Sequence, residues 1–357
     1  MRKLYTVEKI SAIRGAENSD NLEIAVIKGW EAVVKKGAFK EGELISYFEI
    51  DSMIPRSEET EFLFRGKGKE ASSARLKTAR LRGNLSQGLV MSLESTKALY
   101  KALKDQEIDE TFLVEGTDLT ELFNIIKYEP DLPEAEGAKP ADKVWEISKT
   151  DEERYQNAGK LLSAIEGQPF YGSVKLDGTS MTVILNIDEN GEPEVNVCGR
   201  NLCYIEDAQN KYWNIANKYD LKAKMLAHYE KTGVRLAFQG ELCGPKIQGN
   251  KLGLAENDFF VFNVFSANGQ EGFTPVRFSD AMTTVTSFGI SFVPIEYCGD
   301  AYGYKKEDLQ SLTAIKYNKY FPGADPKQNI EGIVFRTQDM SVSFKVISNE
   351  FLLKGGE

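Results

Sequence analysis

Short apolar runs separated by turn residues dominate the first hundred residues. The runs are LYTVEKISAI, LEIAVIKGWEAVVKK, ELISYFEI and GLVMSL, and glycines lie between or beside them. Short strands at near-regular spacing, with glycine at the corners, are typical of a small β-barrel or sandwich. The acidic stretch 100–126 that follows has a helical pattern. The first third of the chain is therefore predicted to be a small β domain with a helical extension.

The rest of the chain alternates longer β runs with few helical stretches. Its strand-like runs are FYGSVKL, MTVILNI, EVNVCGR, RLAFQGEL, FFVFNVF, IVFRT and SVSFKVI, and its main helical pattern covers 206–231. Turns of hairpin length such as DENGEP join some of these runs, which favours antiparallel pairing. The expected fold class is α+β with largely antiparallel sheets.

Length and composition favour two globular units. A chain of 357 residues with 41% hydrophobic side chains exceeds an ordinary single domain and can bury a substantial core. The segment EPDLPEAEGAKPAD, residues 129–142, contains three prolines and an acidic patch, as linkers often do. We expect an OB-like domain with its acidic helical extension at 1–128, a linker at 129–142, and a second domain at 143–357.

The formal net charge of −10 argues at first against a nucleic-acid partner. The stretch from Arg65 to Arg82 reverses this sign locally, because its seven cations are opposed only by Glu70. Clustered cations contact phosphate backbones, although a solvated charged face is the alternative. The candidate contacts, called here the predicted RNA-contact set, are Arg75, Lys77, Arg80 and Arg82.

The sequence also restricts the expected location of the protein and its metal chemistry. No apolar run is long enough for a signal peptide or a membrane helix, so we expect no membrane partner and an intracellular location, cytoplasmic in a bacterium or virus. The four cysteines form no CxxC pair and the chain has one histidine, which argues against a zinc site.

One segment, SVKLDGTS, suggests covalent chemistry. It places Lys175 at a strand end, followed by Asp177 and Gly178 in a turn. A lysine with a pKa near ~10.4 is almost fully protonated at pH 7, so a nucleophilic Lys175 needs a nearby cation or bound metal. By itself KxDG is more typical of a surface turn than of a nucleophile. Other β runs supply Arg200 in CGRN, Glu241 in FQGELCG, Phe262 in FFVFNVF, Glu331 in EGIVFR and Lys345 in SVSFKVI. Triphosphate chemistry needs such cations and metal-holding carboxylates together.

Read in order, these segments resemble motifs I, Ia, III, IIIa, IV and V of the covalent nucleotidyltransferase superfamily, which includes ATP-dependent DNA and RNA ligases and mRNA capping enzymes. The resemblance covers about residues 147–357. The preceding segment ISKTDEERYQN resembles the lead-in of RNA ligases and implies that Arg154 contacts a phosphate.

Two features distinguish the branches of this superfamily. Ser180 stands where DNA ligases and capping enzymes typically have arginine, and only 12 residues follow Lys345, which leaves no room for their C-terminal OB domain. The N-terminal OB-like domain, GWEAVVKKGAFKEGELISYFEIDSMIP, LRGNLSQGL and SFKVISNEFLLK instead resemble the Rnl5 family of RNA ligases.

That resemblance implies an ATP-dependent RNA ligase, which joins 3′-OH RNA to 5′-phosphate ends. The partners it implies are RNA ends bridged in a duplex. Lys175 would take AMP from ATP and release pyrophosphate. The adenylate would pass to the RNA 5′-phosphate, and the 3′-OH would displace AMP. A DNA ligase, a GTP-dependent capping enzyme and an inactive nucleic-acid-binding relative are the alternatives.

The resemblance also implies roles for individual residues at the phosphates. Lys175 is the nucleophile, and Lys345 and Arg154 contact phosphate. Asp177 and Glu331 hold the waters of a Mg²⁺ or Mn²⁺ ion. Many ligases have a second lysine near Lys345, but this chain has none at that spacing.

The remaining implied contacts are to the nucleoside. Arg200 contacts the ribose or the RNA end, Glu241 the ribose hydroxyls, and Phe262 stacks on adenine. Val174 contacts adenine through its backbone, and Gly178 belongs to the ATP-binding turn. Taken singly, the alternatives are a turn carboxylate for Glu241, a core position for Phe262 and a surface cation for Arg200.

Overall fold

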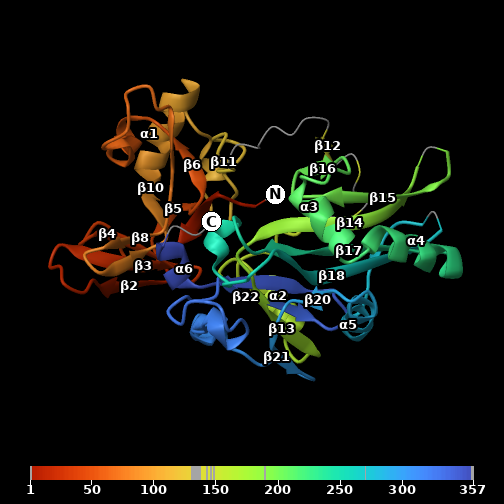
Figure 1. Cartoon of the computed structure of the whole chain (residues 1–357). Coiled ribbons are helices and arrows are strands. Elements are labelled where there is room, and N and C mark those ends of the chain that lie inside the picture. The colour runs from red at the N-terminus through yellow and green to blue at the C-terminus, as the bar shows by residue number, and fades with distance from the viewer. Residues whose placement is uncertain are drawn as a thin grey trace. The chain divides into compact units, whose positions relative to one another are not determined.

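The computed structural model describes residues 2–129, 138–141, 144, 147, 149–188, 190–269 and 271–354. The chain divides into two compact units, which are unit 1 (Met1–Asp131 with Leu352–Glu357) and unit 2 (Leu132–Phe351) (Figure 1). Most of the predicted linker at 129–142 lies outside the described residues, so its assignment stays a prediction.

Unit 1 is built from short antiparallel ladders. Its strands are β1 (Tyr5–Lys9), β2 (Ala12–Gly15), β3 (Leu22–Ile27), β4 (Trp30–Lys35), β5 (Leu44–Glu49), β6 (Ser52–Pro55), β7 (Ser73–Arg75), β8 (Ala79–Leu81), β9 (Asn84–Ser86), β10 (Gly88–Ser92) and β11 (Ile126–Lys127). They pair as β1-β5-β10, β2-β3-β4, β11-β6-β7 and β8-β9. Within the described part of the chain, these ladders do not close into one continuous barrel.

The helical content of unit 1 differs from the prediction. It consists of α1 (Leu93–Lys104) and the 3₁₀ turns η1 (Glu58–Phe64) and η2 (Glu110–Phe112). The prediction of a helix over 100–126 is therefore wrong in its bounds. Helix α1 ends where Asp105 adopts a left-handed φ of 54° and donates its N–H to the Lys101 carbonyl, which closes the last turn.

Unit 2 contains two sheets. Its strands are β12 (Lys139–Pro140), β13 (Phe170–Lys175), β14 (Thr179–Ile187), β15 (Pro193–Cys198), β16 (Leu202–Tyr204), β17 (Val234–Cys243), β18 (Asp258–Asn268), β19 (Thr274–Pro275), β20 (Ser291–Phe292), β21 (Ile295–Gly299), β22 (Gly332–Thr337) and β23 (Ser343–Ile347). The larger sheet has the order β12-β16-β15-β14-β17-β18-β19, with β20 beside β18, and the smaller sheet has the order β21-β13-β22-β23. Only the β18–β20 pair is parallel among the described strand pairs, which confirms the predicted fold class.

Helices and 3₁₀ turns complete unit 2. They are α2 (Gly159–Ile165), α3 (Lys211–Lys218), α4 (Leu221–Thr232), η4 (Gln248–Asn250), α5 (Phe278–Ser287), η5 (Lys306–Asp308), η6 (Ser311–Thr313), η7 (Tyr317–Lys319) and α6 (Asn349–Leu353), whose last two residues are assigned to unit 1. The single helix predicted over 206–231 is two helices, because Asp220 takes a left-handed φ of 52° between them. In the described residues, no helix combines the length and the apolar character needed to cross a membrane.

Strand alternation in the smaller sheet separates its two faces. Apolar side chains at alternate positions enter one hydrophobic core; they are Phe170, Val174, Ile333, Phe335, Phe344 and Val346. The intervening positions are Ser173, Lys175, Val334, Arg336 and Lys345. Because successive side chains of a strand point to opposite faces, the polar groups among them share the other face with Val334. The cations of three neighbouring strands are thereby brought together.

Candidate active site

Lys175 lies at the end of β13 and forms an ion pair with Glu331, the residue before β22. The Lys175 side chain is 28% exposed and that of Glu331 only 4%. Lys175 lies opposite Gly332 in the strand register. A Cβ at Gly332 would lie 2.2 Å from the Val346 carbonyl oxygen, so only glycine allows this close approach of β22 to β23.

Asp177 and Gly178 form the turn that follows β13. Asp177 pairs with Lys251, whose ammonium also lies 4.7 Å from the centroid of the Phe351 ring. A Cβ at Gly178 would lie 2.5 Å from the Leu242 carbonyl oxygen and 2.8 Å from Cγ of Glu241. The turn therefore packs directly on the end of β17, which carries Glu241.

Glu241 lies in a strongly anionic part of this site. Desolvation by burial raises the pKa of the Glu241 carboxyl to about 8, with Glu331 and Asp177 adding to the rise. Lys175 and a hydrogen bond from the Gly178 backbone act in the opposite direction. Three predicted carboxylates and the predicted nucleophile therefore interact with one another electrostatically.

Phe262 occupies a bulge in β18. Gln239 of β17 pairs with Asn263 and Gly240 pairs with Val261, so Phe262 has no partner in the ladder. Bulges redirect side chains and are frequent beside active sites. The ring is partly buried, and the guanidinium carbon of Arg336 lies 5.9 Å from its centroid.

The lead-in segment 149–154 packs along the polar face of the smaller sheet. Lys345 Nζ lies 3.3 Å from Asp151 Oδ1, and Arg336 Nη2 lies 2.6 Å from Glu152 Oε1. Burial would raise the pKa of Glu152, but Arg336, Lys345 and Lys175 hold it below its ordinary value. The Glu152 carboxylate is therefore within electrostatic reach of three cations, which shows that these cations converge on one region.

Three other predicted residues lie around this segment. Arg154 is buried, and its backbone bridges to Lys345 of β23. Arg200 lies in the turn between β15 and β16 and donates to the Thr150 carbonyl at 3.3 Å. The Val174 N–H already donates to the Pro294 carbonyl at 2.8 Å, so a backbone contact of Val174 with a ligand has to use another atom.

Some residues of the site were missed by sequence reasoning. Arg336 and Glu152 lie inside segments used for the resemblance, and Lys251 lies in the basic loop GPKIQGNKLG, so each had a weak signal. Tyr317 had none, since it looks like any core aromatic. Its hydroxyl contacts the backbone of Lys175, as described below.

The predicted RNA-contact set, in unit 1, contains one partly buried, ion-paired residue and three exposed residues. Arg75 Nη2 lies 2.6 Å from Asp51 Oδ1, and its guanidinium carbon is 4.2 Å from the Tyr128 ring centroid. Arg75 therefore has a structural role in addition to the RNA contact that stays a prediction. The other three are exposed; Lys77 precedes the β8–β9 hairpin, Arg80 lies in β8 and Arg82 in its turn.

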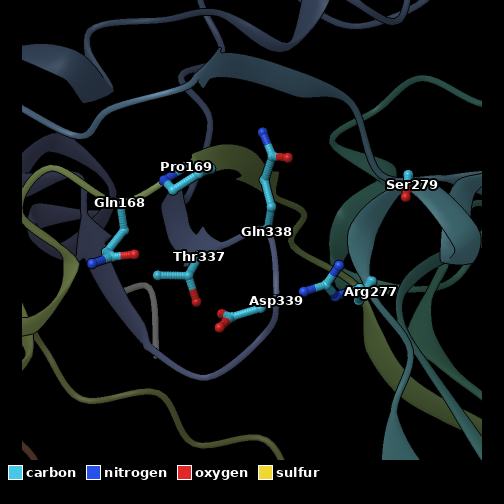
Figure 2. A pocket seen from close by; sticks show the side chains of 7 residues that line it. All are labelled: Gln168, Pro169, Arg277, Ser279, Thr337, Gln338 and Asp339. Atoms are coloured by element: carbon cyan, nitrogen blue, oxygen red, sulfur yellow. The ribbon is translucent and has the colours of Figure 1, made fainter.

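A polar pocket of about 280 Å³ lies at the other end of β13, away from Lys175. Figure 2 shows Gln168, Thr337 and Asp339 on one side of it, and Arg277 and Ser279 on the other. Since none of the predicted site residues lines it, this pocket is separate from the site.

Comparisons with known proteins agree on one family. A family model described as RNA ligase matches residues 168–347, and one described as an OB-fold domain matches residues 4–93. The Naegleria gruberi RNA ligase with PPi is 32% identical, with 99% of each chain covered and a TM-score of 0.78. Two variants of that enzyme, a lysine-to-methionine variant with AMP and Mn and a glutamate-to-alanine variant with ATP and Mn, give the same identity, coverage and TM-score. A comparison with curated protein sequences gives no match.

Proposed function

Because the chain belongs to the RNA ligase family, we propose that it uses ATP to join RNA 3′-OH and 5′-phosphate ends through AMP bound covalently to Lys175. The observation that carries the proposal is the Lys175–Glu331 pair at the end of β13, with Lys345 on the same face of the sheet. A nucleophile, a carboxylate and a phosphate-binding cation are the groups that this reaction requires.

In the first step, the Lys175 amine attacks the α-phosphorus of ATP. A nitrogen–phosphorus bond forms, and the bond to the pyrophosphate oxygen breaks. Lys175 has to lose a proton before it attacks, and Glu331 is the carboxylate in direct contact with it. Lys345 faces the same region, because both ammonium groups act on Glu152. A phosphate between these cations would have its charge offset as the transition state forms.

The carboxylates of the site fit a hard divalent cation. Asp177 and Glu331 are oxygen donors, which Mg²⁺ and Mn²⁺ prefer, and Glu241 adds a third acidic group nearby. Across the described residues, no group of three metal-ligating side chains is close enough to bind an ion directly. We propose that Asp177 and Glu331 hold the ion largely through water. When bound, such an ion supplies positive charge that favours the neutral amine of Lys175.

The nucleoside is proposed to lie between the two sheets of unit 2. Glu241, whose raised pKa keeps it largely protonated near neutral pH, can both donate to and accept from ribose hydroxyls. Phe262, displaced from the ladder by its bulge, offers a ring face for adenine stacking. Arg200 and Arg154 are proposed to contact the ribose or the phosphates, and Gly178 lets the turn approach the nucleotide.

Two further steps complete the proposed reaction. The adenylate passes from Lys175 to the 5′-phosphate of RNA, forming a pyrophosphate linkage and restoring the free lysine. The 3′-OH then attacks that 5′-phosphorus, a phosphodiester forms and AMP leaves. We propose that the RNA ends are bridged in a duplex and that the predicted RNA-contact set binds their phosphates.

Transfer of label to the protein tests the proposal. The chain and a Lys175→Ala variant are incubated with α-labelled ATP and Mg²⁺ or Mn²⁺, and denaturing electrophoresis follows. We expect label on the wild type and none on the variant, then sealing of a nicked RNA duplex. Label from GTP but not from ATP contradicts the proposal in favour of capping chemistry. Label from neither nucleotide points to an inactive nucleic-acid-binding relative.

A further inference from the structure

The hydroxyl of Tyr317 joins three residues of the proposed reaction. It accepts the Asp177 N–H at 3.0 Å and the Glu331 N–H at 3.2 Å, and it donates to the Lys175 carbonyl at 3.1 Å. Lys175 and Asp177 are 142 and 140 positions away in sequence. One oxygen atom therefore links the turn after β13 to the start of β22.

These contacts use the full capacity of the hydroxyl group. A phenolic oxygen donates one hydrogen bond and accepts two, and all three are made here. The Tyr317 side chain is fully buried, so water does not compete for these bonds. The two N–H groups lie at the points where the chain leaves one strand and enters another.

The position of the Tyr317 oxygen is itself fixed by the fold. The Tyr317 N–H donates to the Gln328 carbonyl at 3.0 Å, and its own carbonyl accepts the N–H groups of Tyr320 and Phe321, both at 2.9 Å. The ring packs in the hydrophobic cluster that also contains Val174 and Leu176. Both ends of the side chain are therefore held, and the oxygen acts as a fixed reference for the backbone of the site.

We propose that Tyr317 is a positioning residue for lysine adenylylation, and this inference rests on the proposed function. The hydroxyl of Tyr317 forms its hydrogen bonds with main-chain atoms of Lys175, Asp177 and Glu331. It sets the distance between the Lys175 amine and the Glu331 carboxylate by fixing the two backbones that carry them. Its contribution belongs to the rate of AMP transfer rather than to the affinity for ATP.

Tyr317→Phe tests this role, because it removes one oxygen and keeps the ring. The buried Glu331 N–H and the partly buried Asp177 N–H lose this acceptor, and the turn after β13 becomes free to shift relative to Glu331. Misplacement of reacting groups by ~1 Å costs on the order of 100-fold in rate. We expect kcat for adenylylation to fall by roughly 10-fold to 100-fold. The KM for ATP should stay close to the wild-type value.

Tyr297→Phe is the matched control. Its ring packs against the same cluster, and its hydroxyl donates to the Leu312 carbonyl at 2.9 Å, outside the proposed site. Both variants are assayed for single-turnover AMP transfer well below their unfolding temperatures. A purely structural role of Tyr317 predicts that both variants lose stability and that neither loses kcat. An unchanged kcat in Tyr317→Phe, or a loss confined to KM, overturns the inference.

Hydrogen exchange of the wild type gives a second test that does not depend on a variant folding. If the Tyr317 hydroxyl holds the Asp177 and Glu331 N–H groups, both amides exchange slowly; rapid exchange of either overturns the inference. Absence of label on both wild type and Tyr297→Phe overturns the proposed function, and the inference with it. Label on the wild type with equal kcat in Tyr317→Phe overturns the inference alone.

Discussion

Gly178→Ala adds one methyl group at the closest contact between the turn after β13 and β17. The new Cβ would lie 2.5 Å from the Leu242 carbonyl oxygen, 2.6 Å from Sγ of Cys243 and 2.8 Å from Cγ of Glu241. Gly178 does not have a positive φ, so alanine is not excluded by backbone conformation. The effect of the substitution is therefore a matter of contact alone.

The size of the effect follows from these distances. An ordinary Cβ contact begins at 3.4 Å, so the turn and β17 have to separate by about 0.9 Å. Overpacking of this kind costs typically ~1–3 kcal/mol of unfolding free energy. A displacement near 1 Å between reacting groups costs on the order of 100-fold in rate. We expect Gly178→Ala to remain folded and to lose about two orders of magnitude in AMP transfer.

Single-turnover transfer of AMP from labelled ATP measures this loss. Gly303→Ala is the matched control, because its Cβ would meet nothing within 4 Å and its φ is not in the left-handed region. The control should adenylylate at the wild-type rate. If folded Gly178→Ala does so too, the turn tolerates the shift and the packing argument is refuted.

Three further predictions follow from single contacts. Glu241 has a folded pKa of about 8 against an ordinary value of 4.5, so its stabilising contribution is present below pH 4.5 and is lost as the pH rises through 8. Between these two pH values the unfolding free energy should fall by on the order of 1 kcal/mol per pH unit, and Glu241→Gln should remove this dependence. The measurement is denaturant unfolding at a series of pH values, and the same pH dependence in wild type and variant would contradict the prediction. Glu152→Ala leaves the buried Arg336 without its carboxylate and should lower the unfolding free energy by ~3 kcal/mol, measured by denaturant unfolding, together with slower AMP transfer. Arg75→Ala should lower the unfolding free energy, because it removes the ion pair with Asp51. Simultaneous alanine substitution of the other three members of the predicted RNA-contact set should leave the unfolding free energy and AMP transfer unchanged. It should weaken sealing and reduce the salt dependence of RNA binding. Equal loss of AMP transfer and sealing in that triple variant would show that the set does not act through RNA.

Strand patterns were the most readable part of the sequence. In β13, β22 and β23, apolar residues at every second position predicted strands, and the same alternation carries Lys175, Arg336 and Lys345 on one face. Helix bounds were less readable. The break at Asp220 and the end of α1 at Asp105 depend on left-handed residues that carry a Cβ, which sequence rules assign mainly to glycine.

The candidate site was predicted as separate segments, each with one chemical group. The order of these segments along the chain indicated the family. It did not indicate which side chains of the site contact one another. Lys251 pairs with Asp177 across 74 positions and Arg336 pairs with Glu152 across 184. Nothing local distinguishes these charges from solvated surface groups. Only the tertiary packing of segments far apart in the chain decides which cation meets which carboxylate.

By itself, the sequence predicted the fold class, through the two-residue period of its strands, and the family, through the order of its motifs; the roles of the reactive groups stay predictions. Tertiary structure alone decided the geometry. It placed Phe262 in a bulge, brought Gly178 against β17 and set the Tyr317 oxygen between three backbone groups. Such contacts join residues far apart in the chain, and their distances follow from how the whole core packs.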